Sequence, residues 1–550
     1  MSMLRRLFVV LLSLSVGGLW VACGAGDYGS YNPGGDYNKY GNQETEGKSR
    51  GTSPPPQGPA DAGTSHHNSN SNTSNPNTNT NNTTTPPPVN NNNTAKVNPW
   101  TDPRKDNLST FAIDVDTASY TYSRRMLREQ GVWPSPNSVR VEEFVNFFDY
   151  NYEGPKEAPF KLHVDGAVSP FNKEHHILRV GIQGKRMKPA ERKSMHLTFL
   201  IDTSCSMTGG DRIGLVKASL NILVGEMRDG DTVAIATYAG GTRKVLEPTD
   251  ASKQSVIRSA INSLGTGGGT AMSSGMILAY EMASKSFVKG HENRVIVLSD
   301  GDANIGRTSF TEILATIEKY VKQGITMTTV GFGTGNYRDN RMEQLANKGN
   351  GNYYYVDNED QARRVFRDKF ISTMLTIAKD VKIQVEFDPD YINSYRLIGY
   401  ENRDIADKDF RNDKVDAGEL GSGHNVTALY EVKMNKDKVM PLVQSKSTKP
   451  LITVRLRFKA PHSEADAKAS EVVFPVPGIN LYRDINASSW QTQWATAVMG
   501  FAEILRRSPL AEGWTLEQVE QLATKAKQSD DYHKEFLELL GIAKKLNTKP

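Results

Sequence analysis

Between residues 191 and 378 the chain alternates short apolar runs with segments of helical periodicity. Residues 195–201 and 294–298 are nearly continuous apolar runs, as a strand buried on both faces of a parallel sheet requires. From residue 216 to 227, by contrast, apolar side chains recur every three or four positions, as on one face of a helix. Further strands are expected at 231–239, 245–246, 326–332 and 352–356, and further helices at 252–264, 273–287, 310–323, 340–347 and 360–377. This order predicts an α/β domain with a Rossmann-like, mostly parallel central sheet and helices on both faces.

The pattern changes on both sides of this domain. Residues 99–190 mix strands with helices and predict a small α+β flanking domain. Residues 379–550 begin with strands in which apolar and polar residues alternate, and then become helical. The alternation favours a β-sandwich-like unit with one solvent-exposed face. In these flanks, strands are expected at 111–116, 160–168, 177–182, 381–387, 426–432 and 454–458, and helices at 120–130 and 141–150.

Two more helices are expected near the C-terminus. Trp490, Trp494 and Phe501 lie on the apolar stripe of an amphipathic helix, and we interpret this stripe as core and not as a partner groove. Thr515 and Gln518 have the spacing of a capping box, which predicts that another helix begins there.

The first 22 residues are typical of an export signal. Arg5 and Arg6 precede an apolar stretch that is shorter than the roughly 20 residues of a membrane-spanning helix and ends in small residues. An ordinary cleaved signal peptide or a signal anchor is one interpretation. The sequence up to Cys23, however, resembles a bacterial lipobox, which implies that the Cys23 sulfur is acylated and becomes the mature N-terminus. The Gly24 that follows implies sorting to the outer membrane by the same resemblance.

Residues 23–98 predict a disordered tether. Positions 24–98 contain no Leu, Ile, Phe, Met or Trp, and they are rich in Asn, Thr, Pro and Gly. A segment with so few apolar side chains cannot offset the entropy lost on ordering. The alternative is an aggregation-prone Asn-rich tract, against which the many prolines argue.

Overall composition excludes some classes of function. The chain has 66 Lys and Arg against 62 Asp and Glu, for a net charge of +4, so no clustered basic surface for nucleic acid is indicated. Only two cysteines occur, Cys23 in the leader and Cys205 far inside the chain, and a disulfide between them is not expected. The fold must therefore depend on packing, alone or with a metal ion.

Oxygen-bearing side chains follow two of the expected buried strands. Asp202, Ser204 and Ser206 form a D-x-S-x-S motif after the first strand, and the strand at 294–298 runs into Ser299 and Asp300. A Gly-rich loop at 265–269 directly precedes Thr270. In α/β folds, ligands bind beyond the carboxyl ends of the strands, so these groups are expected at one edge of the sheet. Carboxylate and hydroxyl oxygens are hard ligands that suit Mg²⁺ or Ca²⁺.

Residues 191–378 resemble a von Willebrand factor type A (VWA) domain with its metal-ion-dependent adhesion site. The resemblance implies that Ser204 and Ser206 ligate the metal directly, and that Thr270 does so directly or through water. It implies that Asp202 and Asp300 hold the metal largely through water or through the serine hydroxyls. The expected cation is Mg²⁺, with Ca²⁺ or Mn²⁺ as alternatives. One position stays open for an acidic side chain of a protein partner.

These motifs have other interpretations. Alone, D-x-S-x-S is also a helix N-cap pattern. Asp114 and Asp116 have the spacing of a phosphatase nucleophile motif, but Ala118 stands where that motif wants Thr or Val. No EF-hand, dinucleotide or P-loop pattern is complete, and no catalytic constellation is found, so an enzyme is not expected.

Residues 395–403 and 413–431 extend the resemblance to a bacterial family of VWA lipoproteins with N-terminal and C-terminal flanking domains. The expected function is metal-dependent protein binding or adhesion by an exported, lipid-anchored protein of the cell envelope, at the outer membrane. The alternatives are a metal-dependent hydrolase or phosphatase that uses the same site, and a purely structural envelope component. A hydrolase needs a general base near the metal-bound water, and the motif loops contain no histidine.

Overall fold

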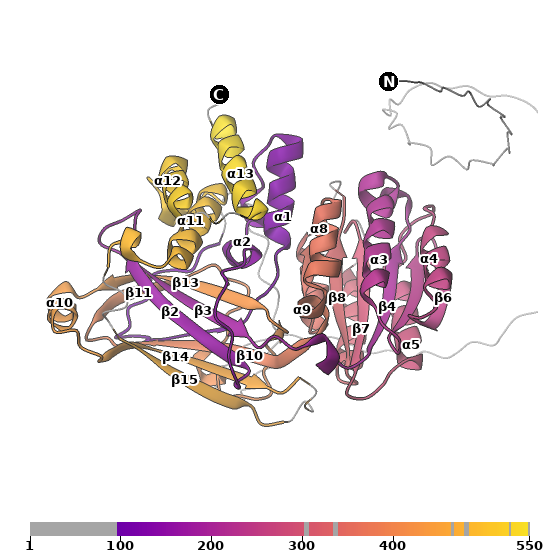
Figure 1. Cartoon of the computed structure of the whole chain (residues 1–550), viewed down its shortest axis with the longest axis horizontal. Coiled ribbons are helices and arrows are strands. Elements are labelled where there is room, and N and C mark those ends of the chain that lie inside the picture. The colour runs from indigo at the N-terminus through magenta and orange to yellow at the C-terminus, as the bar shows by residue number, and fades with distance from the viewer. Residues whose placement is uncertain are drawn as a thin grey trace, which may run out of the picture. The chain divides into compact units, whose positions relative to one another are not determined.

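A six-stranded sheet forms the α/β domain (Figure 1). Its strand order is β6-β5-β4-β7-β8-β9, and every neighbouring pair is parallel except β5 with β6. The strands are β4 (Met195–Asp202), β5 (Thr232–Tyr238), β6 (Thr242–Asp250), β7 (Glu292–Ser299), β8 (Ile325–Gly331) and β9 (Tyr353–Tyr355). The predicted α/β fold with a mostly parallel sheet is therefore confirmed.

The computed structural model describes most of the chain from residue 96 onward, and these residues belong to a single compact unit. The described ranges are 96–301, 307–333, 339–461, 463, 467–477, 483–526, 528 and 530–547. The predicted signal at 1–22, the lipidation site Cys23 and nearly all of the predicted tether lie outside the described residues. Among the helices that the structure describes, none is both long and apolar enough to cross a membrane.

Helices cover both faces of the α/β sheet because alternate strand residues point to opposite sides. Phe199 and Ile201 pack with α3 and α4 on one face, whereas Leu200 packs with α5 and α6 on the other. The helices are α3 (Leu215–Glu226), α4 (Gln254–Asn262), α5 (Met272–Lys285), α6 (Arg307–Val321) and α7 (Asp339–Lys348).

The predicted helix at 360–377 is interrupted and ends early. It consists of α8 (Glu359–Arg363), a π-turn at Arg364–Asp368 and α9 (Phe370–Met374). The next residues, which include the β-branched Thr376 and Ile377, instead begin strand β10, where Thr376 pairs with Gly421. Tertiary pairing thus overrides local helical periodicity at this end.

The two flanks share one β-sandwich. One sheet has the order β1-β10-β14-β15, with β12 also paired to β10, and the other has the order β11-β13-β3-β2. Their inner faces form a common core. The strands are β1 (Leu108–Ala112), β2 (Phe160–Val168), β3 (His176–Gly184), β10 (Thr376–Phe387), β11 (Ile392–Ile398), β12 (Gly418–Gly421), β13 (Asn425–Met434), β14 (Pro450–Lys459) and β15 (Ser470–Pro477).

The segments 99–190 and 379–550 contribute strands to the same two sheets. Strand β1 pairs with β10 and β3 pairs with β13, so each sheet contains strands from both segments. Within the described residues, the two segments are halves of one body, and the VWA-like domain is inserted between β3 and β10.

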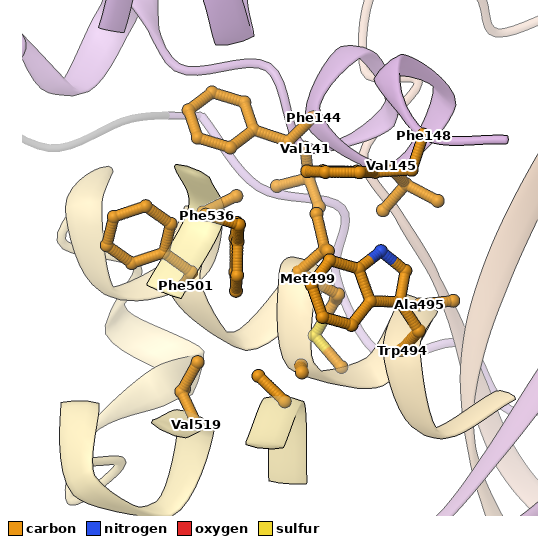
Figure 2. Packing of buried hydrophobic residues seen from close by; sticks show 14 of the residues in the cluster. Val141, Phe144, Val145, Phe148, Trp494, Ala495, Met499, Phe501, Val519 and Phe536 are labelled. Carbon is orange, nitrogen blue, oxygen red and sulfur yellow. The ribbon is translucent and has the colours of Figure 1, made fainter. Parts of the chain in front are cut away.

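A helical layer covers the outer face of the sheet that contains β3 and β13. Figure 2 shows part of its core, where Trp494 on α11 lies against Phe148 with ring centroids 5.2 Å apart. Trp494 is fully buried, so the interpretation of the tryptophan stripe as core is confirmed.

The capping box is also confirmed, because Thr515 N–H donates to Gln518 Oε1 and Gln518 N–H donates to Thr515 Oγ1. The helices of this layer are α1 (Ala118–Arg125), α2 (Val141–Phe147), α11 (Trp490–Leu505), α12 (Leu516–Ala526) and α13 (Asp531–Asn547); α10 (Lys436–Gln444) lies in the sandwich segment.

Candidate metal centre

Asp202 ends β4 in a fully buried position with both carboxylate oxygens engaged. Oδ1 accepts the backbone N–H of Ser204 at 2.9 Å, and Oδ2 accepts the hydroxyl of Ser299 at 3.0 Å. Burial raises the pKa of Asp202, the hydrogen bonds from Ser204 and Ser299 oppose this, and the charge of Asp300 raises the pKa further. The carboxylate is therefore fixed in orientation and is close to a second carboxylate.

The hydroxyls of Ser204 and Ser206 lie 2.9 Å apart. Ser204 has an extended backbone, and the tight turn Cys205–Met207 after it brings Ser206 back beside it. In an octahedral Mg²⁺ site with bonds of about 2.0–2.1 Å, adjacent ligand oxygens are about 2.9 Å apart. The spacing of this pair thus fits two neighbouring ligands of one small cation.

The loop that carries Thr270 is joined to the Asp202 loop by backbone hydrogen bonds. Gly267 N–H donates to Thr203 O at 2.8 Å, and Cys205 N–H donates to Gly268 O at 3.2 Å. Gly268 has φ +83°, and a Cβ there would lie 2.9 Å from the backbone nitrogen of Gly240. Only glycine fits this position, which explains the Gly-rich loop.

Asp300 reaches the same edge from the neighbouring strand. Strands β4 and β7 are parallel partners, with Ile201 opposite Leu298, so their carboxyl ends lie side by side. Asp300 is buried, and Gly301 N–H donates to the hydroxyl of Ser299 at 3.0 Å. The structure therefore places all five predicted site residues on three loops that meet at one sheet edge.

Ser299 and Arg212 take part in this edge although the sequence analysis assigned them no role. Ser299 bridges Asp202 and the Gly301 backbone, and its position before Asp300 in the motif was the available signal. Arg212 donates to the Ser206 carbonyl at 2.7 Å and so supports the turn. No motif marks Arg212. A cavity of about 400 Å³ lies next to these loops and is lined in part by Thr203, Arg243 and Gly267.

The Asp114-x-Asp116 motif lies outside the candidate metal centre, and its carboxylates are paired with an arginine side chain. The guanidinium of Arg403 donates to Asp114 at 3.1 Å and to Asp116 at 3.0 Å, and Asp116 also accepts Tyr353 N–H at 2.7 Å. Both carboxylates are buried, and with Glu143 they form a tight acidic group. A phosphatase nucleophile must be open to substrate, so this arrangement argues against that interpretation.

A second acidic group, formed by Asp380, Asp416 and Glu419, lies on the sandwich segment. Lys459 pairs with Asp380 at 2.8 Å, and Asn350 donates to Asp416 at 3.3 Å. Neither acidic group includes a residue of the candidate metal centre.

The donor chemistry of the Asp202 edge fits Mg²⁺ or another hard divalent cation. It offers two adjacent hydroxyls, a third hydroxyl at Thr270 and two carboxylates, and all of the donor atoms are oxygens. Cys205, within the same turn, is half-buried and forms no disulfide with any other described residue.

Comparison with known proteins defines the class. Residues 196–368 match the family model "von Willebrand factor type A domain", so the chain contains a VWA domain. VWA domains often bind a divalent cation, and the domain suggests a role in protein–protein interaction or adhesion. Residues 88–179 match the model "von Willebrand factor" and residues 372–546 match "Uncharacterized protein YfbK, C-terminal".

The chain is 37% identical over 467 residues to "Uncharacterized protein YfbK" of Escherichia coli strain K12. This matched region covers 81% of this chain and 80% of that protein. It belongs to the YfbK family of VWA domain proteins. Inter-alpha-trypsin inhibitor heavy chain H3 of Mesocricetus auratus is 23% identical over 268 residues, or 44% of this chain and 29% of that protein. Among solved structures, a von Willebrand factor type A protein from Catenulispora acidiphila matches 72% of this chain and 91% of its own, with TM-score 0.42 and 15% identity.

Proposed function

We propose that this protein is a divalent-cation-dependent protein-binding module of the bacterial cell envelope. The observation that carries the proposal is the pair of serine hydroxyls 2.9 Å apart, beside a carboxylate whose orientation is fixed by two hydrogen bonds. A role in adhesion or protein binding follows the class of domain. Cation binding rests on the donor set, which suits Mg²⁺ first and Ca²⁺ or Mn²⁺ as alternatives.

In this proposal, Ser204 and Ser206 hold the cation directly, and Thr270 does so directly or through water. Asp202 and Asp300 act mainly by orienting the hydroxyls and ordered water. When bound, the cation supplies a Lewis acid whose neutral hydroxyl ligands leave it able to attract a further carboxylate. Asp202 positions the Ser204 backbone, and Arg212 positions the Ser206 backbone, so the chain itself sets the ligand geometry.

The partner in this proposal is a protein that presents an acidic side chain to the open coordination position. Its chemistry follows from the hard, positively charged ion, which prefers a carboxylate oxygen over nitrogen or sulfur ligands. No nucleic acid is proposed as a partner, because the chain is close to charge balance with a net charge of +4.

The membrane location in this proposal rests on the sequence around Cys23. We expect Cys23 to carry acyl chains and residues 23–98 to tether the folded part to the outer membrane. Labelling cells with palmitate tests this: wild type should incorporate label into the membrane fraction, and Cys23→Ala should not. Equal labelling of the two proteins would overturn the anchor.

Crosslinked capture from envelope extracts tests the central function. The wild type should retain a partner in Mg²⁺ and release it in EDTA, and Asp202→Ala should fail to capture it in either buffer. Asp250→Ala, which removes a carboxylate at the end of β6 outside the candidate metal centre, is the matched control and should behave as wild type. Capture that persists in EDTA contradicts the proposal. Mg²⁺-dependent turnover of phosphate or ester substrates, lost in Asp300→Ala, would support the hydrolase alternative instead.

A further inference from the structure

A cavity of about 440 Å³ lies where three parts of the described chain meet. Its walls come from the α8–α9 segment of the VWA domain, from the turn between β12 and β13 of the sandwich, and from the end of α2. Its volume is within the range of small-molecule sites. Arg186, Gln361, Arg364, Lys369, His424 and Asn425 are the lining residues that matter for its chemistry.

Lys369 is the central charge of this cavity. Among the residues that the structure describes, none accepts a hydrogen bond from its ammonium group. Burial, together with the positive charges of Arg364 and Arg186 and against the charge of Asp149, lowers the pKa of Lys369 to about 7. The Lys369 side chain is half-buried, and an ammonium group partly removed from water without a close counter-ion is unfavourable, a cost that a bound anion would offset.

Arg364, Asp149 and Asp368, three other charged groups on the walls, are held by protein partners. Arg364 donates to the Phe147 carbonyl and stacks on the Phe147 ring at 4.0 Å, which fixes its positive charge. Asp149 accepts a hydrogen bond from the Asn425 amide at 3.2 Å, and Asp368 accepts one from Arg367 at 2.9 Å. The negative charges on the walls are therefore already engaged.

His424 does not add a positive charge to the cavity. Its Nδ1 accepts Gly421 N–H at 3.3 Å, which requires the neutral ring at that nitrogen. Burial, together with the charges of Lys369 and Arg294, lowers the pKa of His424 to about 3. Lys369, Arg186 and Arg364 thus give the cavity its positive character.

Two buried amide oxygens on the walls have no donor among the described residues. These are Oε1 of Gln361, whose side chain is almost fully buried, and Oδ1 of Asn425. A buried acceptor without a donor costs about 1–3 kcal/mol, so a ligand with hydroxyl or amino groups would match the walls better than a bare anion.

We propose that this cavity binds a small anion with a carboxylate or phosphate group and at least one hydrogen-bond donor, and that Lys369 is its counter-ion. The site is separate from the metal centre. It is built from the VWA domain, the sandwich and α2 together, so the ligand would hold these three parts against one another. The proposal does not depend on cation binding.

Calorimetric titration of the full-length protein tests the site. The probes are inorganic phosphate, glycerol 3-phosphate and glycerate, used in EDTA so that no bound metal ion attracts them. Glycerol 3-phosphate should bind more tightly than phosphate because it adds donors, and glycerate shows whether a carboxylate suffices. Lys369→Met should weaken binding about tenfold or more, as expected for loss of a charged hydrogen-bond partner. Lys173→Met, at an exposed lysine outside the cavity, should bind as wild type.

Proton uptake distinguishes a counter-ion from a structural lysine. With its pKa near 7, Lys369 is mostly neutral at pH 8, and a bound anion should raise this pKa. Binding at pH 8 should therefore take up close to one proton, measured in buffers of different ionisation enthalpy. Lys369→Arg should retain binding without proton uptake, which also covers the case that Lys369→Met does not fold. Absence of binding by all three probes, or equal affinity and uptake in Lys369→Met and wild type, overturns the proposal.

Discussion

The candidate metal centre of the VWA domain and the junction formed by α1 both contain buried charged groups, but they differ in how completely those charges are paired. At the junction, Arg124 donates two hydrogen bonds to Asp357, at 2.8 and 2.5 Å, and a third to Glu535 at 3.0 Å. At the candidate metal centre, Asp202 is equally buried, and the hydroxyls of Ser204 and Ser206 lie 2.9 Å apart beside it. Complete internal pairing indicates a structural role, whereas converging hydroxyl and carboxylate oxygens are a donor set that suits a hard divalent cation.

The junction also ties the VWA domain to the helical layer. Arg124 on α1 binds Asp357, which follows β9 of the VWA domain, and Glu535, which is on α13. The next residue, Arg125, pairs at 2.8 Å with Asp211, in the segment that follows the loop with Ser204 and Ser206. The position of the loop therefore depends partly on residues outside the VWA domain.

The largest effect is expected from Arg124→Met. It leaves the buried carboxylate of Asp357 without its cation, which typically costs about 3–5 kcal/mol. Denaturant unfolding should show this loss in the free energy of unfolding. Arg363→Met, which breaks an exposed pair with Glu359, should change it by less than about 1 kcal/mol. Similar values for the two variants would mean that the junction is not structurally important.

A smaller loss of stability is expected from Asp202→Ala in EDTA. The variant leaves the Ser204 N–H and the Ser299 hydroxyl without their acceptor, at a cost of about 1–3 kcal/mol. Adding Mg²⁺ should raise the melting temperature of the wild type and leave that of Asp202→Ala unchanged. An equal shift in both proteins would place the cation elsewhere.

Glu142 on α2 is a buried carboxyl group that is only partly hydrogen-bonded. It predicts that the free energy of unfolding depends on pH. Its Oε2 accepts Tyr400 N–H, whereas Oε1 is buried without a donor among the described residues. Burial, together with the charges of Glu401 and Asp114, raises the pKa of Glu142 to about 8.

Between pH 4.5 and about 8 the folded protein therefore keeps a proton on Glu142 that the unfolded chain releases, so the free energy of unfolding falls as the pH rises. Glu142→Gln should remove this fall and be more stable than wild type at pH 8. Glu153→Gln, at an exposed site, should keep the wild-type slope. Unfolding curves across this pH range measure both, and an unchanged slope in Glu142→Gln would contradict the assignment.

The smallest effect is expected from Thr270→Ala. In the proposed site Thr270 ligates directly or through water beside two serine ligands, so its loss should weaken Mg²⁺ binding by about tenfold. The free energy of unfolding in EDTA should stay unchanged, since Thr270 is only half-buried. A complete loss of metal binding would mean that Thr270, and not the serine pair, is the main ligand.

The candidate site was predictable from the sequence to a greater extent than the architecture around it. Asp202 and Asp300 directly follow buried parallel strands, and topology alone brings such positions together. The pairing of β3 with β13 joins residues more than 200 positions apart, and no local pattern specifies which distant strand becomes the partner. The same holds for Arg403, whose contact with Asp114 spans 289 positions. Lys369 lies in a helical segment of ordinary composition, and only the assembled walls give it a cavity.

Calorimetric titration with Mg²⁺ tests the central claim most directly. The wild type should bind one equivalent of Mg²⁺, and the double variant Ser204→Ala, Ser206→Ala should bind none while unfolding like wild type in EDTA. Ser284→Ala, Ser286→Ala removes two equally spaced hydroxyls on and just after α5 and should bind like wild type. Undiminished Mg²⁺ binding by the Ser204, Ser206 double variant would contradict the account.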